Sequence, residues 1–198
     1  MSDWIRSVRI PGLSKVGPTD LVHDPLVPRL SIADEIFARP ELPKVFISSR
    51  MRGGVLAGER LAVAREIEST RMARAWYWER DAHGGPFSSF NVCVGHAASS
   101  DALFLILTDD LTRTTRAEYL AAKRNGAFCC ILVLDGAKLS KAAKRFLDTE
   151  SKEVTYCPFR NESELRSQVV DSFRGGLTYG LRLGNIKRRL ERSRRGSR

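Results

Sequence analysis

The sequence lacks the features that mark membrane-spanning and secreted proteins. Its longest apolar run is AFCCILVL at residues 127–134, far shorter than the roughly 20 residues that a helix needs to cross a bilayer. The first residues, MSDWIRSVRIPG, contain no apolar core of the signal-peptide kind. We therefore expect a cytoplasmic protein that makes no membrane contact.

Cysteine is scarce, and its spacing excludes the common metal and redox motifs. The four cysteines are Cys93, Cys129, Cys130 and Cys157, and they form neither a CxxC pair nor a Cys/His ligand set. Cys129 and Cys130 stand inside an apolar run, which is typical of buried free thiols. The sequence therefore predicts free cysteines and indicates neither a zinc site nor a redox pair.

Positive charge is concentrated at the C-terminal end. The 198 residues carry a net charge of +10, and 42% are hydrophobic and 28% charged, which suits a globular protein. Residues 182–198 hold eight Arg or Lys and one Glu, so they account for +7 of this charge. Such a tail can contact nucleic acid non-specifically and in a salt-dependent way, although it offers no aromatic side chain for base stacking. A solubilising or linker role, or the start of a longer native chain, fits at least as well.

Proline separates an N-terminal arm from the rest of the chain. Six of the eight prolines fall within residues 1–43, and proline fixes φ and removes a backbone donor. We expect an extended arm there, interrupted by one short helix at 31–38. Residues 44–175 are expected to form the folded domain, and residues 176–198 the basic tail.

Five apolar segments alternate with helical patterns in the predicted domain. The strands should begin near Lys44, Met72, Ala102, Ala127 and Glu153. The helices are expected at about 55–70, 90–99, 114–125, 138–150 and 161–175. Apolar strands alternating with helices indicate a parallel sheet covered on both faces. The predicted fold is α/β, a flavodoxin-like three-layer sandwich with a five-stranded parallel sheet, whose ligands bind at the carboxyl ends of the strands.

Polar residues follow the first three predicted strands, at this same edge of the sheet. They are Ser48, Ser49 and Arg50 after the first strand, Glu79 after the second, and Asp109 and Asp110 after the third. The first group precedes Gly53 and Gly54, and a small turn before a helix can hold phosphate through backbone N–H groups. A plain tight turn is an equally good interpretation, because neither GxGxxG nor a Walker motif is present.

The stretch TRTTRAEYLAAKRNG, residues 112–126, contains one carboxylate, Glu118, near the start of a predicted helix. Thr115 and Glu118 have the spacing of a capping box, in which the glutamate only stabilises the helix end. The same position also directs the side chain toward the strand ends. A shielded carboxylate there can stabilise positive charge that develops on a sugar. The spacing alone leaves both roles open.

Four motifs occur in an order that resembles a bacterial family of TIR-like domains. They are VFISSRM, GERLAVAREIEST, HAASSDALFLIL and TRTTRAEYLAAKRNG. This family is related to nucleoside 2-deoxyribosyltransferases and often precedes signalling ATPases. The resemblance covers roughly residues 44–175, and it implies a TIR-like fold that cleaves an N-glycosidic bond, most simply that of NAD⁺.

The resemblance also implies roles for single residues. In TIR enzymes and deoxyribosyltransferases the essential glutamate lies early in the helix after the third strand, a position that Glu118 matches. The other matches are Ser48, Ser49 and Arg50 as holders of a ribose or phosphate, the pair Glu59 and Arg60, the acid Glu79, and Thr115 in the substrate site. Arg60 would pair with Glu79 or reach the ligand. Three aromatic side chains would form a wall for a base or belong to the core: Tyr77, Trp78 and Phe90.

Two functions from different classes follow from these observations. The first is an NAD⁺ glycohydrolase, or a related nucleoside or nucleotide N-glycosidase, in bacterial defence or signalling. NAD⁺ would be its substrate, and Glu118 would stabilise the ribosyl cation or activate water. This mechanism requires neither a metal nor a tightly bound cofactor. The second is a TIR-like interaction module that assembles with itself or with a partner signalling protein and cleaves nothing.

Overall fold

The structure is a computed structural model that describes residues 42–51 and 56–196, with side chains described as far as residue 186. Most of the expected N-terminal arm, including the helix predicted at 31–38, lies outside the described residues. The same is true of Gly53 and Gly54 in the turn after the first strand.

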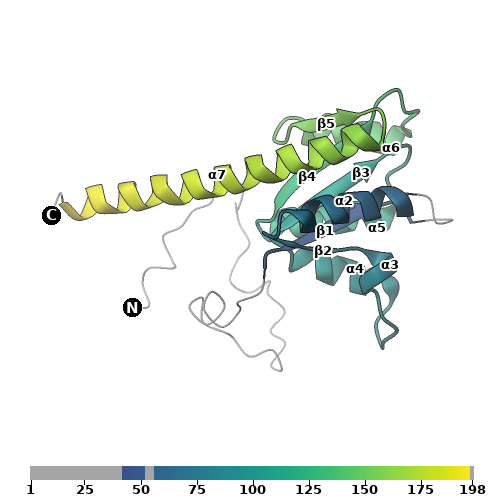
Figure 1. The fold of residues 1–198 in the computed structure, drawn as a ribbon, viewed down its shortest axis with the longest axis horizontal. Helices are drawn as coiled ribbons and strands as arrows, with labels where there is room; N and C mark the ends of the chain where they lie inside the picture. Colours follow the sequence, from purple (N-terminus) through teal and green to yellow (C-terminus); the bar gives the residue numbers. More distant parts are fainter. Residues whose placement is uncertain (1–41, 52–55, 197–198) are drawn as a thin grey trace. The chain divides into compact units, whose positions relative to one another are not determined.

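Five parallel strands form one sheet in the order β2-β1-β3-β4-β5 (Figure 1). The strands are β1 (Lys44–Ser49), β2 (Arg74–Trp76), β3 (Ala102–Leu107), β4 (Phe128–Leu134) and β5 (Tyr156–Phe159). All four neighbouring pairs are parallel. This is the flavodoxin-like strand order, so the predicted fold class is confirmed.

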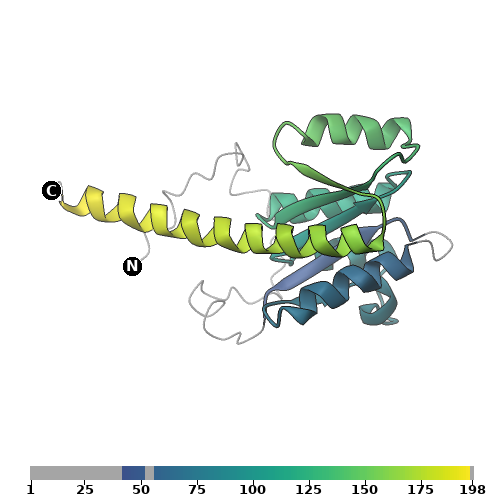
Figure 2. The ribbon, with the colours of Figure 1, turned by 45° about the horizontal axis from the view of Figure 1, so that its top comes forward.

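Helices cover both faces of the sheet, which makes three layers (Figures 1 and 2). One face packs against α2 (Ala57–Ser69) and α7 (Glu162–Gly196), and the other against α4 (Ser89–Ala98), α5 (Arg113–Arg124) and α6 (Lys141–Glu150). Because side chains alternate along a strand, each buried strand supplies both cores. In β1, Val45 and Ile47 belong to the core under α2 and α7, and Phe46 belongs to the core under α4 and α5.

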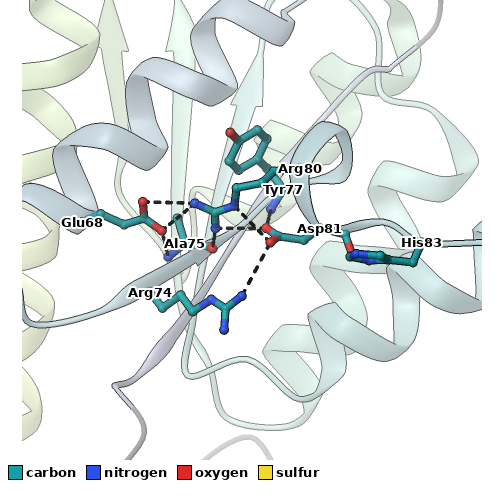
Figure 3. Close-up of polar contacts among 7 residues, drawn as sticks. All are labelled: Glu68, Arg74, Ala75, Tyr77, Arg80, Asp81 and His83. Carbon is teal, nitrogen blue, oxygen red and sulfur yellow. Dashed lines mark hydrogen bonds and ion pairs between the residues drawn. The ribbon is translucent and has the colours of Figure 1, made fainter.

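A short helix, α3 (Trp78–Asp81), follows β2 where we expected the strand to continue to residue 78. Arg80 holds this helix in place, as Figure 3 shows. Its guanidinium donates to both carboxylate oxygens of Glu68 at 2.8 and 3.1 Å, to Asp81, and to the carbonyl oxygen of Ala75. The backbone N–H of Tyr77 also donates to Asp81, at 3.0 Å. These tertiary contacts outweigh the strand propensity of the aromatic residues.

The last helix, α7, continues to Gly196 and does not end at residue 175 as we expected. Its first half is anchored to the sheet by Leu165, Val169 and Phe173. Gly175 and Gly176, at the expected end, lie inside the helix. Gly176 packs directly against the ring of Phe128, where a Cβ atom would come within 2.8 Å of a ring carbon. Among the described residues, no helix is long and apolar enough to span a membrane.

This packing predicts opposite effects for two adjacent glycine substitutions. Gly176→Ala should lower stability by about 1–3 kcal/mol, because the added methyl group overpacks the contact with Phe128. Gly175→Ala should raise stability by roughly 0.5–1 kcal/mol, because its Cβ meets nothing within 4 Å and alanine favours helix. Urea unfolding of both variants measures the difference. Equal effects at the two positions would contradict the packing of Gly176.

Candidate active site

The candidate site lies where β1 and β3 meet at the carboxyl edge of the sheet. In the flavodoxin-like order, the connections leave these two strands in opposite directions, and ligands bind in the resulting crevice. Ser48 and Ser49 end β1 and are buried. Their side chains point to opposite faces of the sheet, so Ser48 contacts α5 and Ser49 contacts α2.

Glu118 is the buried carboxyl group of this site. Only 3% of the residue is exposed, and its Oε2 accepts a hydrogen bond of 2.5 Å from the Ser48 hydroxyl. Burial raises the pKa of Glu118; hydrogen bonds from Ser48 and Cys93 and the charge of Arg60 act in the opposite direction without cancelling it. A carboxyl group with a raised pKa can exchange a proton with a ligand near neutral pH.

The capping-box interpretation of Glu118 is wrong. Helix α5 begins at Arg113, and its N-cap is Thr112, whose hydroxyl accepts from the backbone N–H of Thr115 at 3.1 Å. Thr115 is therefore the third residue of the helix, and Glu118 lies in the second turn, beyond the reach of the helix end. The side chain of Glu118 faces β1 instead. Its burial needs another explanation than helix capping.

Arg60 forms the second polar group of the site, on the α2 side. It is 1% exposed, and its Nε donates to Glu79 at 3.0 Å while its Nη2 forms an ion pair with the same carboxylate. Its Nη1 donates to the Ser49 hydroxyl and, at 3.3 Å, to the carbonyl oxygen of Arg50. Partial burial acts to raise the pKa of Glu79, but the hydrogen bond and charge of Arg60 outweigh it, so the pKa is lowered. The predicted pairing of Arg60 with Glu79 is confirmed.

A small pocket connects the two polar groups. Its lining residues come from β1 and the segment after it and from α2, β2, α3, α4 and α5. They are Phe46, Ile47, Ser48, Ser49, Met51, Arg60, Trp76, Trp78, Cys93 and Glu118. The free space is about 10 Å³, roughly room for one water molecule. The pocket thus joins one carboxyl group, two hydroxyl groups and a guanidinium to an aromatic wall.

Several predicted site residues lie near the pocket without lining it. Thr115 is buried, and its hydroxyl is 3.5 Å from the carbonyl oxygen of Ser49, so it ties α5 to β1. Arg50 pairs with Asp109 at 2.7 Å. Tyr77 belongs to the core under α2, and Phe90 is exposed beside Arg113. Of the three predicted aromatic residues only Trp78 lines the pocket.

Cys93 and Trp76 line the pocket although the sequence did not single them out for the site. The thiol of Cys93 is hydrogen-bonded to Glu118, and burial, together with the neighbouring carboxyl group, raises the pKa of Cys93 to about 12. The thiol is therefore a proton donor to Glu118. The ring of Trp76 stacks between Phe46 and His96, with centroids 4.8 and 4.5 Å away. A cysteine three positions after a predicted helix start offers no signal of this contact, because the contact depends on how α4 packs.

All four cysteines are free, as predicted. Within residues 42–51 and 56–196, no group of three His, Cys, Asp or Glu side chains is arranged as metal ligands would be. The polar groups of the pocket are instead suited to binding hydroxyl groups and to transferring protons.

No protein-family model and no curated protein matches the chain. Solved structures with a similar course of the chain include a CMP N-glycosidase from Clostridium botulinum, at 16% identity and a TM-score of 0.47 over 64% of this chain and 96% of that chain. A conserved protein from Enterococcus faecalis is 12% identical, with a TM-score of 0.45 over 65% and 97% of the two chains. The flavodiiron core of Flv1 from Synechocystis is 11% identical, with a TM-score of 0.44 over 70% and 36%. At these sequence identities and TM-scores, the similarity is limited to the path of the backbone.

Proposed function

We propose that the domain is an N-glycosidase that hydrolyses the bond between a base and its ribose in a nucleoside or nucleotide. The observation that carries this proposal is Glu118, a buried carboxyl group with a raised pKa, hydrogen-bonded to Ser48 in a pocket at the switch point of the sheet. Hydrolysis at a sugar carbon proceeds through a cation-like transition state, and a carboxylate shielded from water stabilises such a charge strongly.

In the proposed reaction the C1′–N bond breaks and the base leaves with the electron pair. The ionised Glu118 stabilises the positive charge that develops on the ribose. A water molecule then adds its oxygen to C1′, and its proton passes to Glu118 and from there to solvent. The Ser48 hydroxyl, now 2.5 Å from Glu118, orients the carboxylate or binds a ribose hydroxyl.

The remaining polar groups position β1 for this chemistry. Arg60 is fixed by Glu79 and in turn holds Ser49 and the backbone of Arg50. Trp78 is only partly buried and lies at the pocket with Met51. Because a ribose ring is much larger than the free space of about 10 Å³, substrate entry requires these two side chains to turn aside. Intrinsic tryptophan fluorescence should therefore report binding.

NAD⁺ is the first substrate to test. Its nicotinamide carries a positive charge and leaves as a neutral molecule without needing a proton, which suits a site whose carboxylate stabilises a cation and accepts a proton from water. The resemblance to TIR-like domains supports this choice and a role in bacterial defence or signalling. Incubation of the purified protein with NAD⁺ and chromatographic detection of nicotinamide tests the proposal. Absence of release from NAD⁺ and from a panel of nucleosides and nucleotides would contradict it.

One observation favours interaction as a second function. Four apolar side chains of α7 are each more than half exposed: Tyr179, Leu181, Leu183 and Ile186. Exposed apolar residues on one helix are typical of a surface that binds another protein. Self-association, or assembly with a signalling partner, is therefore the alternative proposal, and sedimentation of the protein over a range of concentrations tests self-association.

The basic end of α7 predicts how any nucleic-acid contact should behave. Deletion of residues 182–198 removes +7 of the +10 net charge. Binding to a DNA duplex should weaken and its salt dependence should flatten, because fewer counterions are released. Fluorescence anisotropy at several salt concentrations measures both quantities. Unchanged binding by the truncated chain would place the contact elsewhere.

A further inference from the structure

An ion pair joins the ends of β1 and β3 beside the pocket. Arg50 stands between Ser49 and Met51, which both line the pocket, and its Nη1 lies 2.7 Å from Oδ2 of Asp109. The two side chains are 27% and 39% exposed. A solute at the mouth of the pocket can therefore reach both of them.

The guanidinium of Arg50 has one donor for which the described residues provide no partner. Its Nε atom is buried and, among the described residues, has no hydrogen-bond partner. A buried donor without a partner costs roughly 1–3 kcal/mol. The contact with Asp109 is made by Nη1 and leaves Nε without a partner among the described residues, whereas an anion with several oxygens can engage Nε and a terminal nitrogen together. Phosphate and carboxylate groups bind arginine in this bidentate way.

The surroundings allow the ion pair to open at small cost. The backbone of Arg50 is fixed, because its carbonyl oxygen accepts from the buried Arg60, so only the side chain has to turn. Asp109 keeps a partner of its own, since its Oδ1 accepts from the backbone N–H of Asp110 at 2.7 Å. Its partial exposure also lets water replace Arg50.

We propose that Arg50 is the receptor for a phosphate group of the substrate, and that Asp109 occupies this receptor until phosphate displaces it, an assignment that rests on the N-glycosidase function proposed above. The substrate class is then phosphorylated: a nucleoside 5′-phosphate or a dinucleotide such as NAD⁺. Asp109 acts as a specificity-determining residue. Its negative charge repels the incoming phosphate, so only a group that binds Arg50 through two hydrogen bonds replaces it.

Titration with inorganic phosphate tests the receptor without any need for activity. At constant ionic strength maintained with chloride, the wild-type protein should show a saturable rise in melting temperature. Arg50→Gln should abolish the rise. Arg50→Lys should weaken it, because lysine keeps the positive charge but cannot donate two parallel hydrogen bonds to one anion. Asp109→Asn should bind phosphate about tenfold more tightly, a change of roughly 1.4 kcal/mol.

Matched controls come from charged residues away from the pocket. Arg160→Gln breaks an exposed pair with Glu164, and Asp148→Asn removes an exposed carboxylate from α6. Both should bind phosphate as the wild type does. A phosphate response that survives in Arg50→Gln, or an Asp109→Asn protein that binds no more tightly than the wild type, would overturn the assignment.

Kinetics then tests the substrate class. Arg50→Gln should raise the KM for a nucleoside 5′-monophosphate at least tenfold more than it raises the KM for the unphosphorylated nucleoside. The effect of the same substitution on the KM for NAD⁺ shows whether Arg50 binds a diphosphate bridge or a terminal phosphate. An equal effect on phosphorylated and unphosphorylated substrates would contradict the proposal. If the wild-type protein cleaves none of them, the proposed function fails, whereas the phosphate titration still decides the assignment of Arg50.

Discussion

Glu118→Gln is expected to lower the rate of N-glycosidic cleavage by about 10²–10⁴-fold, the usual contribution of a positioned acid or base. Glutamine fits the same space and can still accept a hydrogen bond from Ser48. It carries no negative charge and accepts no proton from water, so both proposed contributions of Glu118 disappear. Nicotinamide release from NAD⁺, or base release from the substrate that the wild type cleaves best, measures the loss. A variant as active as the wild type would show that Glu118 does no chemistry.

Thr112→Ala is the matched control on the same helix. Thr112 is the N-cap of α5 and does not line the pocket. Its loss should cost about 1 kcal/mol of stability, a fall in melting temperature of roughly 2–4 °C for a domain of this size. Turnover at temperatures well below the transition should fall far less than in Glu118→Gln. A comparable loss of activity in both variants would mean that the fold of α5, and not the carboxylate, limits the reaction.

The pH dependence of stability should identify Glu118 independently of activity. Its pKa in the folded protein is raised above the ordinary glutamate value of 4.5, so the folded state binds more protons than the unfolded state above that pH. Stability is therefore fully present below the unfolded pKa and is lost as pH rises through the folded pKa. Glu118→Gln removes this loss. The variant should be more stable than the wild type at neutral pH, with the difference shrinking toward pH 4, as unfolding curves at several pH values would show.

Most of the fold could be predicted from the sequence, because the three central strands, β1, β3 and β4, are compact apolar runs. ALFLIL is buried throughout, and AFCCILVL is buried at its centre. Such runs are recognisable without tertiary information. The two errors arose where a distant contact decides the local structure. Arg80 ends β2 early through Glu68 and Ala75, and Gly176 stays helical because it packs against Phe128.

The site could be predicted only in part, for a related reason. The alternation of β1 places Ser48 and Ser49 on opposite faces, and this follows from sequence alone. The role of Glu118 depended on where α5 begins, and TRTT offers three threonines as N-cap candidates. The choice of Thr115 was wrong by three residues, nearly a full helical turn. The hydrogen bond from Cys93 and the buried Nε of Arg50 depend on packing between elements, which no local pattern encodes.

Glu79→Gln is expected to destabilise the domain by about 2 kcal/mol, more than almost any other surface substitution. Arg60 is 1% exposed, and its ion pair with Glu79 compensates its buried charge. Removing one partner of a fully buried pair costs roughly 3–5 kcal/mol. The expected loss is smaller here because the Glu79 side chain is 35% exposed, so water can partly solvate the guanidinium. Urea unfolding at neutral pH measures the loss.

Glu162→Gln provides the same chemical change at an exposed pair. Glu162 lies 2.7 Å from Arg166, with 60% of its side chain exposed, and such surface pairs contribute only about 0–1 kcal/mol. The two variants should also differ in how much stability they lose as the pH falls. The pKa of Glu79 is lowered, so the stability that it contributes is present above the unfolded pKa and is lost as pH falls through the folded pKa.

Adding Arg60→Met to Glu79→Gln should recover part of the lost stability, because a methionine leaves no buried charge behind. The recovery should be incomplete, since the Ser49 hydroxyl and the Arg50 carbonyl oxygen lose the donor that now holds them. A double variant that is less stable than Glu79→Gln alone would mean that Arg60 acts mainly as a hydrogen-bond donor to β1. Glu79 would then serve only to orient it, and removing the buried charge would not recover stability.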